Sequence, residues 1–240
     1  MICNYHIAIC YATDRGGWRS ALTYGAMADD SILVNGASDA PITLVLAHGA
    51  GAAMDSRFMN IVAEAIGGAE VRVVRFEFPY MAARRTSGKR GAPDREPVLL
   101  DSWRSVIAKL GDGAKIVIGG KSMGGRIASM VADEAGVAGL VCLGYPFHPP
   151  GNPARTRTKH LENLRTPALI IQGTRDTFGL PDEVVKYKLS KKIRIFWIEA
   201  GDHSLKPPAR SGRTEAQNIA SAIEEVQRFI AKAEDLSACE

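Results

Sequence analysis

The chain has 240 residues, of which 46% are hydrophobic and 23% are charged, and its formal net charge is +4. These values are ordinary for a soluble globular protein, and the length suits one large domain or two small ones with a substantial core. No apolar stretch is long enough to span a bilayer, so we expect no membrane association. The mild positive charge is explained by a solvated surface, and we expect no nucleic-acid partner.

The cysteine content indicates the compartment. The four cysteines show no paired spacing of the kind that binds metal, and one of them, Cys142, lies in an apolar run where a reduced core thiol is expected. This usage suits a reducing cytosol, so we expect a cytoplasmic protein. We expect neither a metal nor a cofactor.

The first 26 residues differ from the rest of the chain. They show no periodicity, and they lack the basic segment and apolar core of a signal peptide. A regular pattern begins only after Met27. We therefore interpret residues 1–26 as a doubtful N-terminal extension from an upstream start, with a loosely attached native segment as the alternative, and residues 27–240 as one domain.

Apolar runs of strand length alternate with amphipathic runs of helix length along this domain. Strands are expected at residues 31–34, 42–47, 71–78, 115–118, 137–143, 168–172 and 192–198. Helices are expected at residues 56–66, 98–110, 126–132, 157–163, 181–189 and 214–233. The alternation predicts an α/β fold with a mostly parallel sheet of about six strands and helices on both faces. Ligands of such sheets bind at the carboxyl ends of the strands.

The pattern breaks down between residues 81 and 97, where a long polar loop is expected. This segment is rich in basic residues and punctuated by Gly and Pro. Arg84 and Arg90 in this loop could clamp an anionic substrate, such as a carboxylate, a phosphate or an acyl-CoA group. A solvated loop held by surface ion pairs explains the same composition equally well.

A glycine-rich stretch at residues 119–125 is the strongest motif. It follows an apolar strand and precedes a helix, and Gly120, Ser122 and Gly124 fit the G-x-S-x-G pattern of a nucleophile elbow. In such a turn the serine lies at the start of a helix, where the dipole favours developing negative charge. A plain Gly-rich turn would also match this short pattern.

Two glycine-containing segments partly match nucleotide-binding motifs. A P-loop ending in Gly-Lys-Ser needs a glycine five residues before its second glycine, and that position holds Lys115. A dinucleotide fingerprint beginning at Gly49 and Gly51 needs a third glycine where Met54 stands. Both alternatives are rejected.

Other chemistry-bearing residues follow further strands. Residues 48–51 (His-Gly-Ala-Gly) follow the strand at 42–47, Asp176 follows the strand at 168–172, and His203 follows the last strand. The order Ser, Asp, His is the order of α/β-hydrolases. These groups should therefore meet Ser122 at one edge of the sheet.

Each group has a chemical role in this interpretation. His203 would accept the proton of Ser122 and later donate it to the leaving group, and Asp176 would orient the imidazole. The N–H of Met123 and an N–H of Ala50, or alternatively of Gly51, would stabilise the oxyanion. Asp176 could instead be a helix cap.

Several further residues have weaker interpretations. Asp202 is an alternative acid beside His203, and His160 is another candidate for packing or substrate contact. Six residues are possible substrate contacts. Packing also explains two of them, His48 and His148, and a third, Lys121, could point away from the site. This set is His48, Tyr80, Arg84, Arg90, Lys121 and His148.

These motifs together resemble the α/β-hydrolase superfamily, in its dienelactone-hydrolase-like region. The resemblance begins near residue 42, continues to the C-terminus and rests on the segments at residues 46–51, 78–81 with 88–90, 120–125, 144–151 and 172–176. The most specific resemblance is to a small family of bacterial hydrolase-like proteins. Their eukaryotic relatives include the hydrolase-like domain of a nonspecific-lethal chromatin-complex subunit. The resemblance implies a compact hydrolase core with a minimal cap and an open site.

The sequence therefore predicts a serine hydrolase that cleaves a small ester or thioester, neutral or anionic, through an acyl-enzyme. A hydrolase-like binding or scaffold module with little turnover is the alternative, because a fold alone does not establish an activity. A dienelactone-type hydrolase is disfavoured, since that group usually carries a cysteine where this chain has Ser122.

Overall fold

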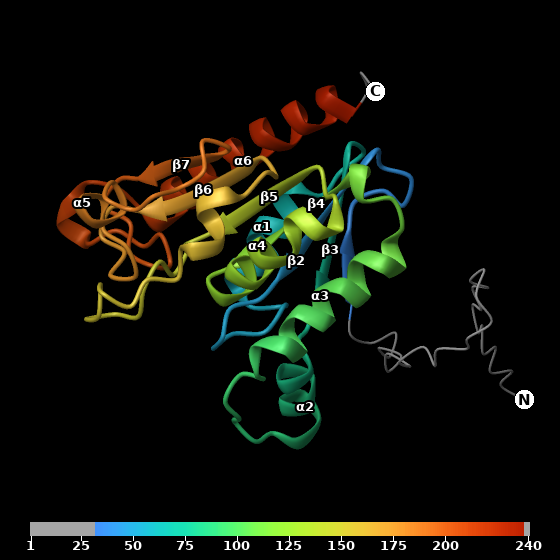
Figure 1. Ribbon diagram of the computed structural model, residues 1–240, viewed down its shortest axis with the longest axis horizontal. Coiled ribbons are helices and arrows are strands. Elements are labelled where there is room, and N and C mark those ends of the chain that lie inside the picture. The colour runs from blue at the N-terminus through green and yellow to red at the C-terminus, as the bar shows by residue number, and fades with distance from the viewer. Residues whose placement is uncertain (1–31, 238–240) are drawn as a thin grey trace, which may run out of the picture.

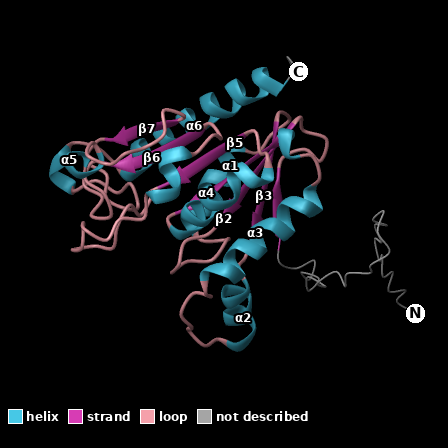
Figure 2. Ribbon diagram, in the orientation of Figure 1, coloured by secondary structure: helices cyan, strands magenta, loops and turns pink. Residues whose placement is uncertain are grey.

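The computed structural model describes residues 32–237, with side chains described as far as residue 232. The domain is a seven-stranded sheet flanked by helices (Figures 1 and 2). The elements in chain order are β1 (Ile32–Asn35), β2 (Ile42–Ala47), α1 (Arg57–Ile66), β3 (Val71–Phe76), α2 (Pro79–Ser87), α3 (Glu96–Leu110), β4 (Ile116–Lys121), α4 (Met123–Ala135), β5 (Gly139–Leu143), β6 (Ala168–Gly173), α5 (Pro181–Val184), β7 (Ile193–Ile198) and α6 (Glu215–Ser237).

The sheet confirms the predicted fold class. Its strand order is β1-β3-β2-β4-β5-β6-β7, and every neighbouring pair is parallel except β1 with β3. The short edge strand expected at 31–34 is β1, which pairs antiparallel with β3. Because β4 lies in the middle, the turn that follows it is surrounded by the carboxyl ends of β2 and β5.

Alternating side chains in the buried strands divide the core between the two faces. In β2, Val45 and Ala47 pack with α3 and α4, whereas Leu44 and Leu46 pack with α1 and α6. This two-residue period is the geometry of a strand that is covered on both faces. The helices bury side chains at helical spacing. In α1 one apolar stripe packs on the sheet, and it is formed by Met59, Val62, Ala63 and Ile66.

The segment expected to be a loop at residues 81–97 is partly helical. α2 begins at Pro79 and ends before Gly88, which adopts the left-handed conformation. The helix buries only Met81. α3 begins at Glu96 rather than at residue 98. Proline suits the first turn of a helix, because its missing N–H would be unpaired there. The apolar period missed α2 because a helix with one buried residue has almost no period.

Two other helices are shorter than expected. α5 ends at Val184 instead of residue 189, and the chain continues in tight turns, such as the bond from the N–H of Tyr187 to the carbonyl of Val184. The helix expected at 157–163 is a 3₁₀ turn over Lys159–Asn163. Both segments lie at the surface, where few apolar contacts extend a helix beyond one turn.

The described chain carries no lid inserted over the sheet, in agreement with the expected minimal cap. None of the helices within residues 32–237 is long and apolar enough to cross a membrane. The doubtful segment at residues 1–26 lies outside the described residues.

Candidate active site

Ser122 lies in the turn between β4 and α4, in a backbone conformation that non-glycine residues rarely adopt, with φ 51° and ψ −113°. Strain of this kind persists only where the surroundings enforce it, and it is typical of functional sites. Two neighbouring glycines allow the turn to pass close to β2. A Cβ atom at Gly120 would lie 2.2 Å from the carbonyl oxygen of Ala47, and one at Gly124 would lie 2.4 Å from the same oxygen.

The predicted serine, histidine and aspartate side chains meet. His203 Nε2 lies 2.8 Å from Ser122 Oγ, and His203 Nδ1 lies 2.8 Å from Asp176 Oδ2. Asp176 is fully buried, whereas about a quarter of the His203 side chain is exposed. Because a carboxylate only accepts hydrogen bonds, Nδ1 must carry a proton, which leaves Nε2 of the neutral ring to accept from the Ser122 hydroxyl.

The carboxylate of Asp176 is held by two further donors. Gln172 Nε2 donates to Oδ2 at 2.9 Å, and the N–H of Phe178 donates to Oδ1 at 2.9 Å. Asp176 therefore closes a turn, but it caps no helix, since the N-cap of α5 is Leu180. Asp202, the alternative acid, accepts hydrogen bonds from the N–H groups of Ser204 and Lys206.

Two contributors to the site were missed by the sequence interpretation. Gln172 is fully buried at the end of β6, and it also pairs with both backbone groups of Tyr145. A glutamine in an otherwise apolar strand was the available signal. The Phe178 ring packs on the His203 ring with 4.2 Å between centroids. Phe178 is a partly buried aromatic residue in a loop, and the sequence offers no comparable signal for it.

The turn after β2 lies against Ser122. A Cβ atom built on Gly49 would lie 3.7 Å from Ser122 Cβ. Tyr80 anchors this turn, because its hydroxyl donates to the carbonyl oxygens of Gly49 at 3.3 Å and Ala50 at 3.0 Å. No hydrogen bond described within residues 32–237 uses the N–H groups of Ala50, Gly51 or Met123.

His48 is a structural part of the same turn. Its ring is fully buried, Nδ1 donates to the carbonyl of Gly49 at 2.7 Å, and Nε2 accepts from the N–H of Phe78 at 3.1 Å. Burial lowers the pKa of His48, which favours the neutral ring that this pairing requires. Both ring nitrogens already have partners in the fold. His48 therefore joins the turn to α2, and the prediction that it contacts substrate is wrong.

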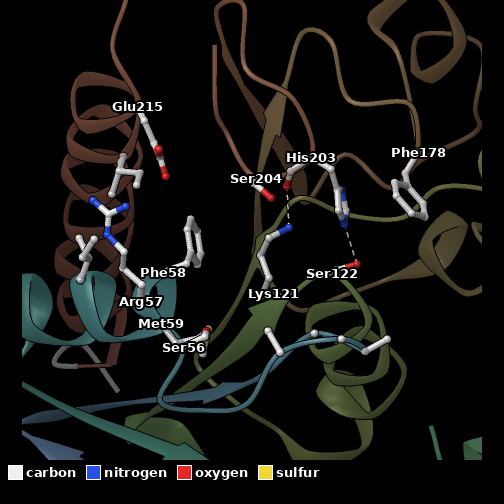
Figure 3. A pocket seen from close by; sticks show the side chains of 16 residues that line it. Ser56, Arg57, Phe58, Met59, Lys121, Ser122, Phe178, His203, Ser204 and Glu215 are labelled. Atoms are coloured by element: carbon white, nitrogen blue, oxygen red, sulfur yellow. Dashed lines mark hydrogen bonds between the residues drawn. The ribbon is translucent and has the colours of Figure 1, made fainter. Parts of the chain in front are cut away.

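A cavity of about 570 Å³ opens beside Ser122 (Figure 3). Ser122, His203 and Phe178 lie at one end, and the first residues of α1 and α6 lie at the other. Among the predicted site residues, the lining includes Ala50, Gly51, Lys121, Ser122 and His203.

Five predicted substrate contacts lie outside this lining: His48, Tyr80, Arg84, Arg90 and His148. His148 is buried, and its ring bonds to the carbonyl of Pro149 and to Glu183, so packing explains it. The basic segment contains an ion-pair network, in which Arg85 joins Glu77 and Asp55. This network favours the surface ion-pair interpretation over a clamp.

Lys121 is the one basic side chain of the predicted set that reaches the cavity. Its ammonium donates to the carbonyl oxygen of His203 at 2.6 Å, and burial lowers its pKa to about 8. Within residues 32–237 no group of three or more His, Cys, Asp or Glu side chains is arranged to hold a metal ion.

Solved structures share this fold. An α/β serine hydrolase without a lid from Xanthomonas campestris, XC6422, is 19% identical with a TM-score of 0.60, over 82% of this chain and 88% of that one. A serine hydrolase homologue from Coxiella burnetii is 17% identical with a TM-score of 0.63, over 85% and 94%. Est1E from Butyrivibrio proteoclasticus is 13% identical with a TM-score of 0.59, over 86% and 96%.

The family comparison covers most of the domain. The model of the alpha/beta hydrolase domain matches residues 40–231, which includes every strand from β2 to β7 and each of Ser122, Asp176 and His203. The narrower resemblance, to dienelactone-hydrolase-like proteins and to a chromatin-complex subunit, stays a prediction. With the fold, the strained turn after β4 and this match together, the chain belongs to the α/β-hydrolase domain family.

Proposed function

We propose that this protein is a serine hydrolase that cleaves a small carboxylic ester or thioester through an acyl-enzyme. The observation that carries the proposal is the hydrogen-bonded series from Ser122 through His203 to Asp176, at the end of an open cavity. A serine hydroxyl is a weak nucleophile and needs such a base. The solved serine hydrolases with this fold support the same class of reaction.

In the first half-reaction, Ser122 Oγ attacks the substrate carbonyl carbon while His203 Nε2 takes the hydroxyl proton. Asp176 keeps the imidazole oriented and stabilises the imidazolium. The tetrahedral intermediate collapses, the bond to the leaving group breaks, and His203 returns the proton to the departing alkoxide or thiolate. Water then attacks the acyl-enzyme by the same route, and the products are a carboxylic acid and free Ser122.

The oxyanion of each tetrahedral intermediate needs donors that are already in place. The N–H of Met123 begins α4, where the helix dipole adds to its donor strength. The N–H of Ala50, with that of Gly51 as the alternative, comes from the turn that lies against Ser122. Since no hydrogen bond within the described part of the chain uses these N–H groups, they are available to bind an oxyanion.

Labelling with a fluorophosphonate probe tests the proposal, because the probe reacts only with an activated serine. The wild-type protein should be labelled, and Ser122→Ala should not be. Ser129→Ala is the matched control: Ser129 also bonds a histidine, His160 at 2.9 Å, but it is buried outside the cavity. Absence of the label from the wild type would favour a binding module without turnover, and a label that survives in Ser122→Ala would contradict Ser122 as the nucleophile.

A further inference from the structure

The cavity beside Ser122 contains a cation without a counter-ion. Figure 3 shows the Lys121 side chain between the Phe58 ring and His203. Its Nζ donates to the carbonyl of His203 and lies 5.9 Å from the centre of the Phe58 ring. Within residues 32–237 it forms no ion pair with a carboxylate. An ammonium has three N–H donors, and the described chain uses one of them.

The two neighbouring carboxylates, those of Asp176 and Asp202, form hydrogen bonds with other groups. Asp176 holds His203, and Asp202 closes the turn around it. Both raise the pKa of Lys121, but burial outweighs them and lowers it to about 8. A desolvated charge is unfavourable unless an opposite charge or several hydrogen bonds compensate it. Lys121 lines the cavity, so a bound anion is the available compensation.

The position of the ammonium relates it to the reacting serine. His203 contacts Lys121 through its backbone carbonyl and Ser122 through its ring. An anion bound to Lys121 would therefore lie in the same cavity as Ser122. The lining also includes the apolar side chains of Phe58 and Ile219, the hydroxyl of Ser204, a second cation, Arg57, and one carboxylate, Glu215, which limits the negative charge that the cavity accepts.

We propose that Lys121 is a specificity-determining residue that binds a carboxylate of the substrate, so that monoanionic esters or thioesters are preferred over neutral ones of the same length. This inference rests on the proposed hydrolase function. It transfers the recognition of an anion from Arg84 and Arg90, which do not line the cavity, to a lysine next to the nucleophile.

Matched ester pairs test the preference. The monoethyl esters of succinic, glutaric and adipic acid are compared with ethyl butanoate, pentanoate and hexanoate, and butanoyl glycolate extends the test to a carboxylate on the alcohol side. Hydrolysis is followed by NMR at pH 7. Wild-type protein should show a kcat/KM ratio that favours the carboxylate member of at least one pair, and Lys121→Met should lower that ratio about tenfold or more.

Lys115→Met is the matched control, because Lys115 is exposed directly before the amino end of the same strand, β4. It removes the same charge outside the cavity, and the ratio should not change. Equal losses of kcat/KM on anionic and neutral esters in Lys121→Met would overturn the inference in favour of a structural role. A wild-type ratio that favours neutral esters in every pair would overturn it as well.

A binding measurement separates this inference from the proposed function. Monoethyl glutarate is titrated calorimetrically into Ser122→Ala and into the double variant Ser122→Ala/Lys121→Met. Binding to the first that weakens about tenfold in the second supports the carboxylate site even if no ester is hydrolysed. Equal binding to both proteins, or none to either, refutes the site whether or not Ser122 is labelled by fluorophosphonate.

Discussion

Gln172 Nε2 donates a hydrogen bond to Asp176 Oδ2 at 2.9 Å, and both side chains are fully buried. The same glutamine accepts from the N–H of Tyr145 at 2.7 Å and donates to its carbonyl at 3.2 Å. One side chain therefore joins the end of β6, the excursion after β5 and the acid that orients His203. A buried carboxylate keeps a fixed orientation only where such donors surround it.

Gln172→Met should destabilise the protein and weaken its chemistry together. The substitution keeps the volume but leaves the N–H of Tyr145 unpaired and removes a donor from Asp176, so we expect a loss of about 2–4 kcal/mol in the free energy of unfolding. Urea unfolding measures it. Gln227→Met, on the exposed face of α6, should change stability by less than about 0.5 kcal/mol. Similar losses in both variants would contradict the role of Gln172.

Tyr80→Phe should lower kcat more than it changes KM. Its hydroxyl bonds the carbonyls of Gly49 and Ala50, and removing it loosens the turn that is proposed to bind the oxyanion. Burial raises the pKa of Tyr80 to about 12, so the hydroxyl keeps its proton throughout the neutral range. We expect a decrease of about tenfold in kcat, measured on a neutral ester.

The control for that measurement is Tyr187→Phe. The Tyr187 hydroxyl has no hydrogen-bond partner within the described part of the chain, so its removal should leave kcat unchanged. An unchanged kcat in Tyr80→Phe would show that the turn holds its shape without this tether.

Arg85→Met should destabilise the fold without changing substrate preference. Arg85 pairs with Glu77, whose side chain is 1% exposed, and with the half-exposed Asp55. Removing the partner of a buried carboxylate leaves an uncompensated charge, although the exposure of Arg85 reduces the cost, so we expect a loss of about 1–3 kcal/mol. Arg90→Met changes an exposed side chain and should change stability by less than about 0.5 kcal/mol. A selective loss of activity on anionic esters in either variant would restore the clamp interpretation.

Lys121→Met should stabilise the protein, and the gain should depend on pH. The pKa of Lys121 is 10.5 by reference and about 8 in the fold, so between these values the unfolded chain binds more protons and wild-type stability rises with pH. The cost of the buried charge is therefore fully present below pH 8 and is relieved toward pH 10.5.

Since the hydrogen bond to His203 is lost at the same time, we expect a net gain of about 1–2 kcal/mol at pH 7 that becomes smaller at pH 9.5. Urea unfolding at the two pH values measures the difference. A gain of the same size at both would show that the charge of Lys121 is not its source. Loss of function with increased stability is a frequent trade-off at active sites.

The sequence by itself determined which segments form buried strands, that the sheet is mostly parallel, and that Ser122, Asp176 and His203 follow three different strands. These features follow from local rules. A continuous apolar run of strand length indicates a buried strand, and a serine between glycines after such a run indicates a sharp turn, without reference to the remainder of the chain.

Only the tertiary structure decided which further polar groups support the predicted site and the fold. These pairings are Gln172 with Asp176, Arg85 with Glu77 and Lys121 with the carbonyl of His203, and each joins a residue of a helix or strand to a residue in a loop. α2 shows the same limit, since its single buried residue gives no period and Arg85 ties it to the core. Hydrogen bonds and ion pairs depend on distances of a few ångströms between elements, which a one-dimensional pattern does not encode.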